Sequence, residues 1–328
     1  MESVSNRLDT LLAGGVRAVI GPTASGKSAL ALAIAEAAGA ELVALDSMQV
    51  YRGMDVGTAK PTAAERARAR HHMLDLVLPR EEFDVTRFLG ALADVLEDAA
   101  RRDARTLFVG GTGFYLKVLL ERMFEGPPVD HELRARLEER AALLGPAALH
   151  RELALRDPKS AARIHPNDGK RVVRALEVLE QTGRPLSEWQ REWRSFAGES
   201  ASTARPRMLV GLDLDVPELD RRIAARVDAM LAAGWEDEVR AIEAAGGFSK
   251  TAIQALGYAE VQAIVRGATS REVARARIAL ATRQFARRQR TWYRKFPETT
   301  WLAAAEPGEN ASAEAARVRA ALRALGWD

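Results

Sequence analysis

The sequence contains no cysteine, few aromatic residues and no long apolar run. Without cysteine, disulfides and thiolate metal sites are excluded, and we expect a cytoplasmic protein. Apolar runs such as residues 29–35 are far shorter than a membrane span, so no membrane association is expected. The 328 residues suffice for about two domains, and 47% hydrophobic with 28% charged residues is typical of globular proteins.

Short apolar segments alternate with helical segments along much of the chain. The segments predicted to be strands are 16–20, 41–45, 106–109, 207–214 and 299–302, and helices are predicted over 27–38 and 88–101. This alternation predicts an α/β fold, with a parallel sheet covered by helices on both faces. Functional groups belong at the carboxyl ends of such strands, where Lys27, Asp46 and Thr112 fall.

The character of the chain changes near Gly126-Pro127-Pro128, which indicates a domain boundary. From Asp130 to about Trp193 every segment is helical in pattern, and no strand is predicted. We therefore predict a core interrupted by an all-helical insertion. The predicted parts are residues 1–125 (first part of the core), 126–200 (insertion) and 201–328 (second part, with basic C-terminal helices).

Residues 21–28 read GPTASGKS, the G-x-x-x-x-G-K-S pattern of a phosphate-binding loop between a strand and a helix. Backbone N–H groups at the helix start would surround the phosphate, Lys27 would add a cation, and the Ser28 hydroxyl would hold Mg²⁺. The predicted diphosphate-binding residues are Gly21, Thr23, Ala24, Ser25, Gly26, Lys27 and Ser28. The loop alone fits a kinase, an NTPase or a transferase with a diphosphate leaving group.

Polar groups follow two of the other predicted strands. Asp46 could hold Mg²⁺ through water or accept a proton from a nucleophile, or it could serve as a helix N-cap or turn aspartate. Thr112 places a hydroxyl within the segment GGTG, which could approach a ligand or form a tight turn that needs positive φ. His71 and His72 are adjacent, and neighbouring strand residues point to opposite faces, so we predict no metal site there.

Basic residues gather in two places. Over residues 283–296, helical spacing puts four arginines on one stripe (Arg283, Arg287, Arg290 and Arg294) and three aromatic residues opposite, facing the core (Phe285, Trp292 and Phe296). No acidic residue at i±4 neutralises Arg283, so an external anion such as an RNA backbone is the expected partner, with a solvated basic face as the alternative. In the insertion, Lys170, Arg171 and Arg174 open a helix, which suits RNA contact, although single arginines are often merely solvated.

Eight motifs occur in an order that resembles the tRNA dimethylallyltransferases over residues 16–302. They are GPTASGKS, DSMQVYRGMDVGTAKP, HHMLDL, GGTGFYLKVL, RIHPNDGKRVVRALEV, GLDLD, RIAARVDAMLAAGW and RQFARRQRTWYRK. Members of this family transfer a prenyl group from dimethylallyl diphosphate to the exocyclic amine of the adenine next to the anticodon. The resemblance thus implies tRNA and dimethylallyl diphosphate as partners, with Mg²⁺ as cofactor, and we expect a monomer.

The resemblance also implies residue roles. Asp46 matches the general base, Thr112 the threonine near the bridging oxygen of the diphosphate, and Arg226 the arginine on the leaving group. Arg221 and Arg222 lie close by and are alternatives for that arginine. The implied tRNA contacts are Asp46, Ser47, Met48, Gln49, Thr112, Arg134, Lys170, Arg171, Val172, Val173, Arg174, Gln254, Arg287, Arg290 and Arg294.

Two other functions compete with prenyl transfer to N6 of adenine. A small-molecule P-loop kinase using ATP would explain the loop and Asp46, but it gives the insertion and the arginine stripe no use. A non-catalytic RNA-binding NTPase is the third possibility. We predict prenyl transfer, with attack on carbon rather than on phosphorus.

Overall fold

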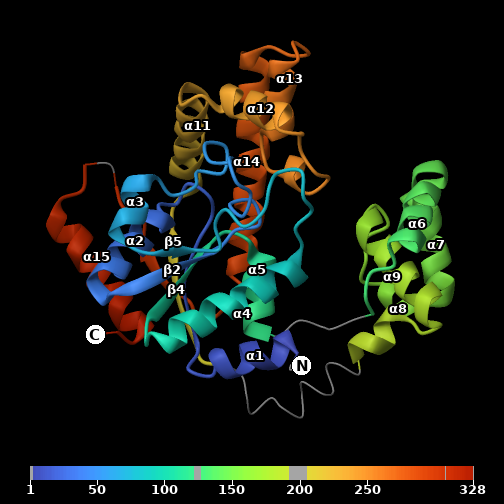
Figure 1. Cartoon of the computed structure of the whole chain (residues 1–328), viewed down its shortest axis with the longest axis horizontal. Helices are drawn as coiled ribbons and strands as arrows, with labels where there is room; N and C mark the ends of the chain where they lie inside the picture. Colours follow the sequence, from blue (N-terminus) through green and yellow to red (C-terminus); the bar gives the residue numbers. More distant parts are fainter. Residues whose placement is uncertain (1–2, 122–126, 192–204, 307, 328) are drawn as a thin grey trace. The chain divides into compact units, whose positions relative to one another are not determined.

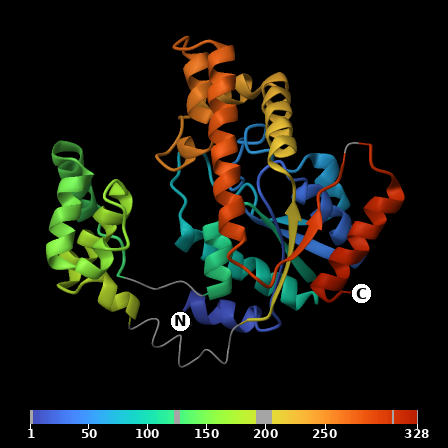
Figure 2. The ribbon, with the colours of Figure 1, turned by 180° about the vertical axis from the view of Figure 1, so that it is seen from behind.

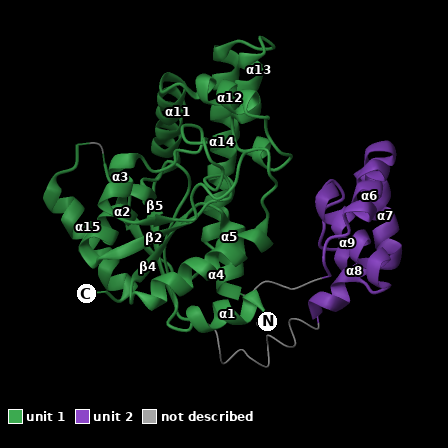
Figure 3. Cartoon of the chain, in the orientation of Figure 1, with its two compact units in different colours: residues 1–121, 205–328 green, residues 122–204 purple. Residues whose placement is uncertain are grey.

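The computed structural model describes residues 3–121, 127–191, 205–306 and 308–327. The chain forms two compact units: residues 1–121 with 205–328, and residues 122–204 (Figure 3). The domain limits predicted at residues 126 and 200 fall in stretches outside the described residues.

A six-stranded parallel sheet organises the first unit, in the order β3-β2-β4-β1-β5-β6. The strands are β1 (Val16–Ile20), β2 (Ala40–Leu45), β3 (His71–His72), β4 (Arg105–Gly110), β5 (Arg207–Asp213) and β6 (Thr300–Ala303). This confirms the predicted α/β fold. β3 was not among the predicted strands because its two residues carry no pattern of their own: the strand exists through its pairing with β2.

Helices cover both faces of this sheet. Figures 1 and 2 show α2 and α15 on one side and α4 and α5 on the other, with α11 to α14 beyond the end toward which β5 points. The helices of this unit are α1 (Val4–Leu11), α2 (Lys27–Ala38), α3 (Ala63–Arg68), α4 (Val85–Arg101), α5 (Gly113–Glu121), α11 (Val216–Ala232), α12 (Trp235–Ala244), η2 (Ala252–Gln254), α13 (Tyr258–Val265), α14 (Arg271–Tyr293) and α15 (Ala311–Leu325).

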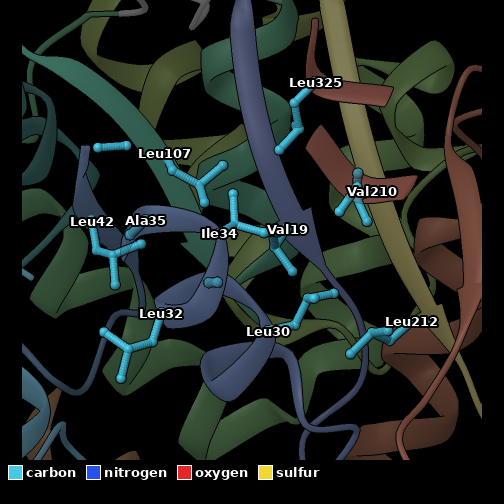
Figure 4. Close-up of a cluster of buried hydrophobic side chains, with 13 residues drawn as sticks. Val19, Leu30, Leu32, Ile34, Ala35, Leu42, Leu107, Val210, Leu212 and Leu325 are labelled. Carbon is cyan, nitrogen blue, oxygen red and sulfur yellow. The ribbon is translucent and has the colours of Figure 1, made fainter. Parts of the chain in front are cut away.

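A cluster of buried side chains fixes α2, and with it the loop at its N-terminus. Leu30 and Ile34 of α2 pack with apolar residues of the neighbouring strands and of α15, among them Val19, Leu107, Val210 and Leu325 (Figure 4). Each fully buried side chain of this size contributes roughly 1.5–3 kcal/mol. The helix ends at Gly39, whose φ of 62° suits glycine, so both limits of α2 match the prediction.

The second unit is helical throughout its described part, as predicted. Its helices include α6 (His131–Leu144), α7 (Pro146–Arg156), α8 (Pro158–Ala161) and α9 (Gly169–Thr182). The core contains Leu137, Leu153, Val172, Val173 and Leu176. Because Val172 and Val173 are 0% and 4% exposed, the implication that they contact tRNA is wrong for their side chains, which belong to the apolar face of α9.

A buried carboxylate organises the charges of this unit. Glu177 is fully buried and accepts hydrogen bonds from the backbone N–H of Asp130 (3.1 Å), from Arg134 (2.7 Å) and from Arg174 (2.7 Å). Two of the implied tRNA contacts therefore share one anion: Arg134 joins α6 to α9 through it, and Arg174 pairs with it within α9. The trio keeps one net positive charge near the surface.

Glu177→Gln is expected to destabilise this unit by roughly 2–3 kcal/mol, since it leaves two partly buried guanidinium groups without their anion. Hydrogen exchange of the α6 and α9 amides in the full chain should accelerate accordingly. Glu180→Gln, on the same helix but in a more exposed ion pair, serves as control and should change stability by less than about 1 kcal/mol. Equal protection in both variants would contradict the role of Glu177.

Candidate active site

A cavity of about 290 Å³ lies at the carboxyl ends of the strands in the first unit. It is lined by Lys27, Asp46, Thr112 and Arg226 together with Thr23 and Ser28 of the phosphate-binding loop. The fold thus brings the three predicted catalytic residues and the loop into one space, as expected for the functional end of a parallel sheet.

Two residues of the phosphate-binding loop have left-handed backbone conformations. Gly26, with φ of 90°, caps the N-terminus of α2, and Ala24 has φ of 63°, which costs a residue with a β-carbon roughly 1 kcal/mol or more. Lys27 Nζ donates to the Pro22 carbonyl at 3.3 Å. The buried Ser25 Oγ has no hydrogen-bond partner among the described residues. Such a loop, with helix N–H groups behind it, is an anion-binding concavity.

Asp46 combines the two roles that the sequence left open. Its Oδ1 accepts from the backbone N–H groups of Met48 (2.8 Å) and Gln49 (3.3 Å), so the residue does shape the turn after β2. Its Oδ2 accepts no hydrogen bond from any residue in the described part of the chain. Burial raises the pKa of Asp46, against the opposing effects of those N–H groups and of Lys27. A carboxylate with one open oxygen and raised basicity can accept a proton.

Thr112 connects the turns after β2 and β4. Its backbone N–H donates to Leu45 O (3.1 Å), and its Oγ1 accepts from Ser47 N (3.2 Å). One of the two acceptor positions of the hydroxyl is therefore occupied, and its hydrogen remains available to donate to an oxygen of a ligand.

The glycines around Thr112 are required by close packing, not by positive φ. A β-carbon would lie 2.2 Å from Leu45 O at Gly110, 2.5 Å from Gln289 Nε2 at Gly111 and 2.6 Å from the Trp292 ring at Gly113. None of the three has positive φ, so the tight-turn alternative is wrong. The glycines allow the β4–α5 connection to approach β2 and α14.

Of the three candidate arginines, Arg226 is the one that lines the cavity. Arg221 and Arg222 both form ion pairs with Glu218 (2.7 Å each), whereas Arg226 has no ion-pair partner in the described regions. Burial lowers the pKa of Arg226. Burial, reinforced by the charge of Arg226, also lowers the pKa of Lys27 to about 8, although Asp46 opposes the shift. Glu65 also lines the cavity, but its carboxylate accepts hydrogen bonds from Thr62. Lys27 and Arg226 are thus cations without an ion-pair partner among the described residues, which favours an anionic ligand.

The rest of the cavity wall is largely apolar. Its apolar side chains from α11, α12 and α14 are Ile223, Val227, Met230, Trp235, Ile278 and Phe285. The same cavity therefore offers cations for phosphate and a hydrocarbon surface for an apolar group.

Two charged residues that sequence reasoning missed hold the loop between β2 and α3. Glu238 of α12 accepts from the backbone N–H groups of Asp55 (2.7 Å) and Val56 (2.6 Å) and from the Tyr258 hydroxyl. Lys60 Nζ is buried and binds Asp75 at 2.7 Å. These contacts join elements far apart in the sequence, so no local pattern signals them.

The arginine stripe of α14 has acidic partners from other elements. Arg287 lies 3.5 Å from Asp220 of α11, and Arg290 lies 3.7 Å from Asp213 of β5. The expectation that the stripe needs an external anion, which was drawn from α14 alone, is therefore wrong for these two residues. Arg287 is still 61% exposed, and Arg294 caps the helix at the surface. Phe296 is buried, as predicted for the aromatic face.

The remaining implied tRNA contacts lie partly in the first unit and partly in the second. Ser47, Met48, Gln49 and Gln254 line the cavity of the first unit. Lys170 and Arg171 are exposed at the start of α9 in the second unit.

Neither histidine after β2 takes part in a metal cluster within the described residues. His72 Nε2 pairs with Glu41 at 2.7 Å, and His71 Nδ1 lies 2.7 Å from the Ala69 carbonyl. No helix in the described part of the chain combines the length and the apolar composition of a membrane-spanning segment.

Fold and cavity together define a P-loop-type α/β protein with an anion-binding site beside an apolar wall. The pattern that defines the IPP transferase family matches residues 49–296. The tRNA dimethylallyltransferase of Symbiobacterium thermophilum is 46% identical over 288 residues, which cover 87% of this chain and 88% of the relative. The chain belongs to the IPP transferase family.

Two solved structures have the same fold. The tRNA isopentenylpyrophosphate transferase of Bacillus halodurans superposes with a TM-score of 0.67 at 32% identity, covering 95% of this chain and 97% of that one. A eukaryotic dimethylallyltransferase, solved acting on tRNA, gives a TM-score of 0.72 at 27% identity, covering 92% and 77%.

Lys27→Met is expected to stabilise the ligand-free protein at pH 7 by roughly 1–3 kcal/mol. The unfolded chain binds the Lys27 proton more tightly than the folded one, so below pH 8 the charged lysine opposes folding, and the stability of the native sequence rises as pH increases above about 8. Thermal unfolding should show a higher Tm for the variant at pH 7 and a smaller difference at pH 9.5. A lower Tm of the variant at both pH values would contradict this description of Lys27.

Proposed function

We propose that this chain transfers a dimethylallyl group from dimethylallyl diphosphate to N6 of the adenine adjacent to the anticodon in tRNA, releasing diphosphate. The observation that carries the proposal is the cavity that combines Lys27 and Arg226, the carboxylate of Asp46 and an apolar wall. Relatives named tRNA dimethylallyltransferase support tRNA as the acceptor. We further propose that the enzyme acts as a cytoplasmic monomer.

The cavity suits a small prenyl diphosphate. At about 290 Å³ it is at the lower end of the range for ligand sites, which favours a five-carbon diphosphate over a nucleoside triphosphate. The phosphate-binding loop, Lys27 and Arg226 would hold the diphosphate, and the apolar side chains of α11 and α14 would receive the prenyl group. The relatives named above are transferases that act on tRNA, which gives the kinase alternative no support.

The donor set at the strand ends fits Mg²⁺. Ser28 lines the cavity and offers a hydroxyl oxygen, the kind of ligand that this hard cation prefers. Bound there with the diphosphate, Mg²⁺ would offset the charge that develops on the leaving group.

Different residues of this chain would accept the proton and stabilise the leaving group in this reaction. The N6 lone pair of adenine attacks C1 of the dimethylallyl group, forming a C–N bond while the C1–O bond breaks and its electron pair moves to the diphosphate. Asp46 accepts the proton that N6 loses, which makes a weakly nucleophilic amine more reactive. Lys27, Arg226, the loop N–H groups and the Thr112 hydroxyl stabilise the departing diphosphate.

The acceptor base has to reach a cavity inside the core unit. A base stacked in an anticodon loop has to leave its stack to enter, so we propose that the adenine is flipped out. Gln49 and Gln254 at the cavity, and the exposed cations of α14 and α9, are the proposed contacts for the surrounding RNA.

Asp46→Asn is expected to lower prenyl transfer at least about 100-fold, because the amide cannot accept the N6 proton. The variant keeps an oxygen that can accept the turn hydrogen bonds, so diphosphate binding should persist. The assay follows labelled dimethylallyl diphosphate or labelled ATP with unmodified tRNA. Asp94→Asn, an exposed carboxylate on α4, serves as control.

Three outcomes would overturn parts of this proposal. ATP consumption without prenyl transfer by the native sequence would exclude the transferase function. Full transfer by Asp46→Asn would remove Asp46 as the base, and simultaneous loss of transfer and diphosphate binding would assign it to the turn or to Mg²⁺.

A further inference from the structure

One buried amide joins the two loops of the active site. Gln289 of α14 is 6% exposed. Its Oε1 accepts from the backbone N–H of Thr23 (2.8 Å), and its Nε2 donates to the carbonyl of Gly111 (2.6 Å). A carboxamide has one acceptor end and one donor end, and here each end meets a backbone group of the opposite kind.

These two backbone groups belong to two different loops of the proposed diphosphate site. Thr23 belongs to the phosphate-binding loop after β1, and Gly111 directly precedes Thr112 after β4. Four residues further along α14, the buried Tyr293 hydroxyl donates to Gly110 O at 3.2 Å. One face of α14 therefore ties the loop that binds the diphosphate to the loop that presents Thr112.

The amide has little freedom to rearrange. A β-carbon at Gly111 would lie 2.5 Å from Gln289 Nε2, so the side chain fills the space beside that glycine. Reversing the amide would place its NH₂ group against Thr23 N–H and its oxygen against Gly111 O, leaving both backbone groups unpaired. The hydrogen-bond pattern thus selects one orientation.

We propose that Gln289 is a positioning residue that fixes the separation and orientation of the phosphate-binding loop and Thr112. The expected effect of Gln289 on turnover rests on the proposed prenyl transfer. Its expected effect on diphosphate binding is independent of that proposal. Gln289 neither accepts a proton nor breaks a bond. It sets the distance between the two loops that would hold the leaving group, and small displacements of such groups reduce rates strongly.

The experiment uses the full-length protein and three variants. Gln289→Met removes both hydrogen bonds at nearly constant volume. Gln289→Glu restores the pattern only when its carboxyl group is protonated, because the neutral acid donates to Gly111 O and accepts from Thr23 N. Gln284→Met is the matched control, since Gln284 is exposed on the same helix.

Two quantities are measured below the Tm of each variant, from pH 5.5 to 8.5, and expressed as ratios to the native sequence at the same pH. They are the Kd of inorganic diphosphate by calorimetry and the kcat of prenyl transfer. We expect Gln289→Met to weaken diphosphate binding about 10-fold and to lower kcat about 10- to 100-fold at every pH. Gln284→Met should leave both ratios near one.

Gln289→Glu provides the readout that a purely structural role would not give. At pH 8.5 its carboxylate faces Gly111 O and repels the diphosphate. The Kd ratio should therefore be higher, and the kcat ratio lower, than for Gln289→Met. As pH falls and the carboxyl group becomes protonated, both ratios should recover toward one, whereas those of Gln289→Met stay flat.

Native-like diphosphate binding by Gln289→Met, or a Gln289→Glu ratio that does not change with pH, would overturn the inference. If the native sequence transfers no prenyl group, the proposed function fails, and the diphosphate affinities still decide the role of Gln289.

Discussion

Two cations that have no ion-pair partner among the described residues are the constraint on which the site depends. Lys27 and Arg226 line one cavity with the carboxylate of Asp46, and burial lowers the pKa of both cations and raises that of Asp46. An arrangement that opposes folding persists when a ligand compensates it. A diphosphate would supply the compensating negative charge, and the apolar wall beside it suits the prenyl group attached to such a diphosphate.

The long helix α14 holds this arrangement together. Its buried face packs on α11, which carries Arg226, and reaches both loops of the site through Gln289 and Tyr293. Its outer face carries Arg287 and Arg294. The helix that is proposed to meet RNA is thus also the scaffold of the diphosphate site, so catalytic geometry and RNA contact share one rigid element.

The strands and the phosphate-binding loop could be predicted because their signals are local: short apolar runs for the strands, and glycines at fixed spacing for the loop. Asp46 and Thr112 could be placed together because parallel strands end on one edge. Other contacts could not be predicted, because each joins elements that are distant in the sequence. They are the ion pairs of Arg287 and Arg290, the loop contacts of Glu238 and the hydrogen bonds of Gln289. The burial of the Val172 and Val173 side chains could have been predicted, because their apolar spacing marks the core face of α9.

The most direct test of this view of the cavity is a calorimetric comparison of dimethylallyl diphosphate, inorganic diphosphate and ATP, each with Mg²⁺. If the cations hold a diphosphate and the apolar wall holds a prenyl group, dimethylallyl diphosphate should bind at least about 10-fold more tightly than either other ligand. Tighter binding of ATP than of dimethylallyl diphosphate, with release of phosphate from ATP, would contradict it.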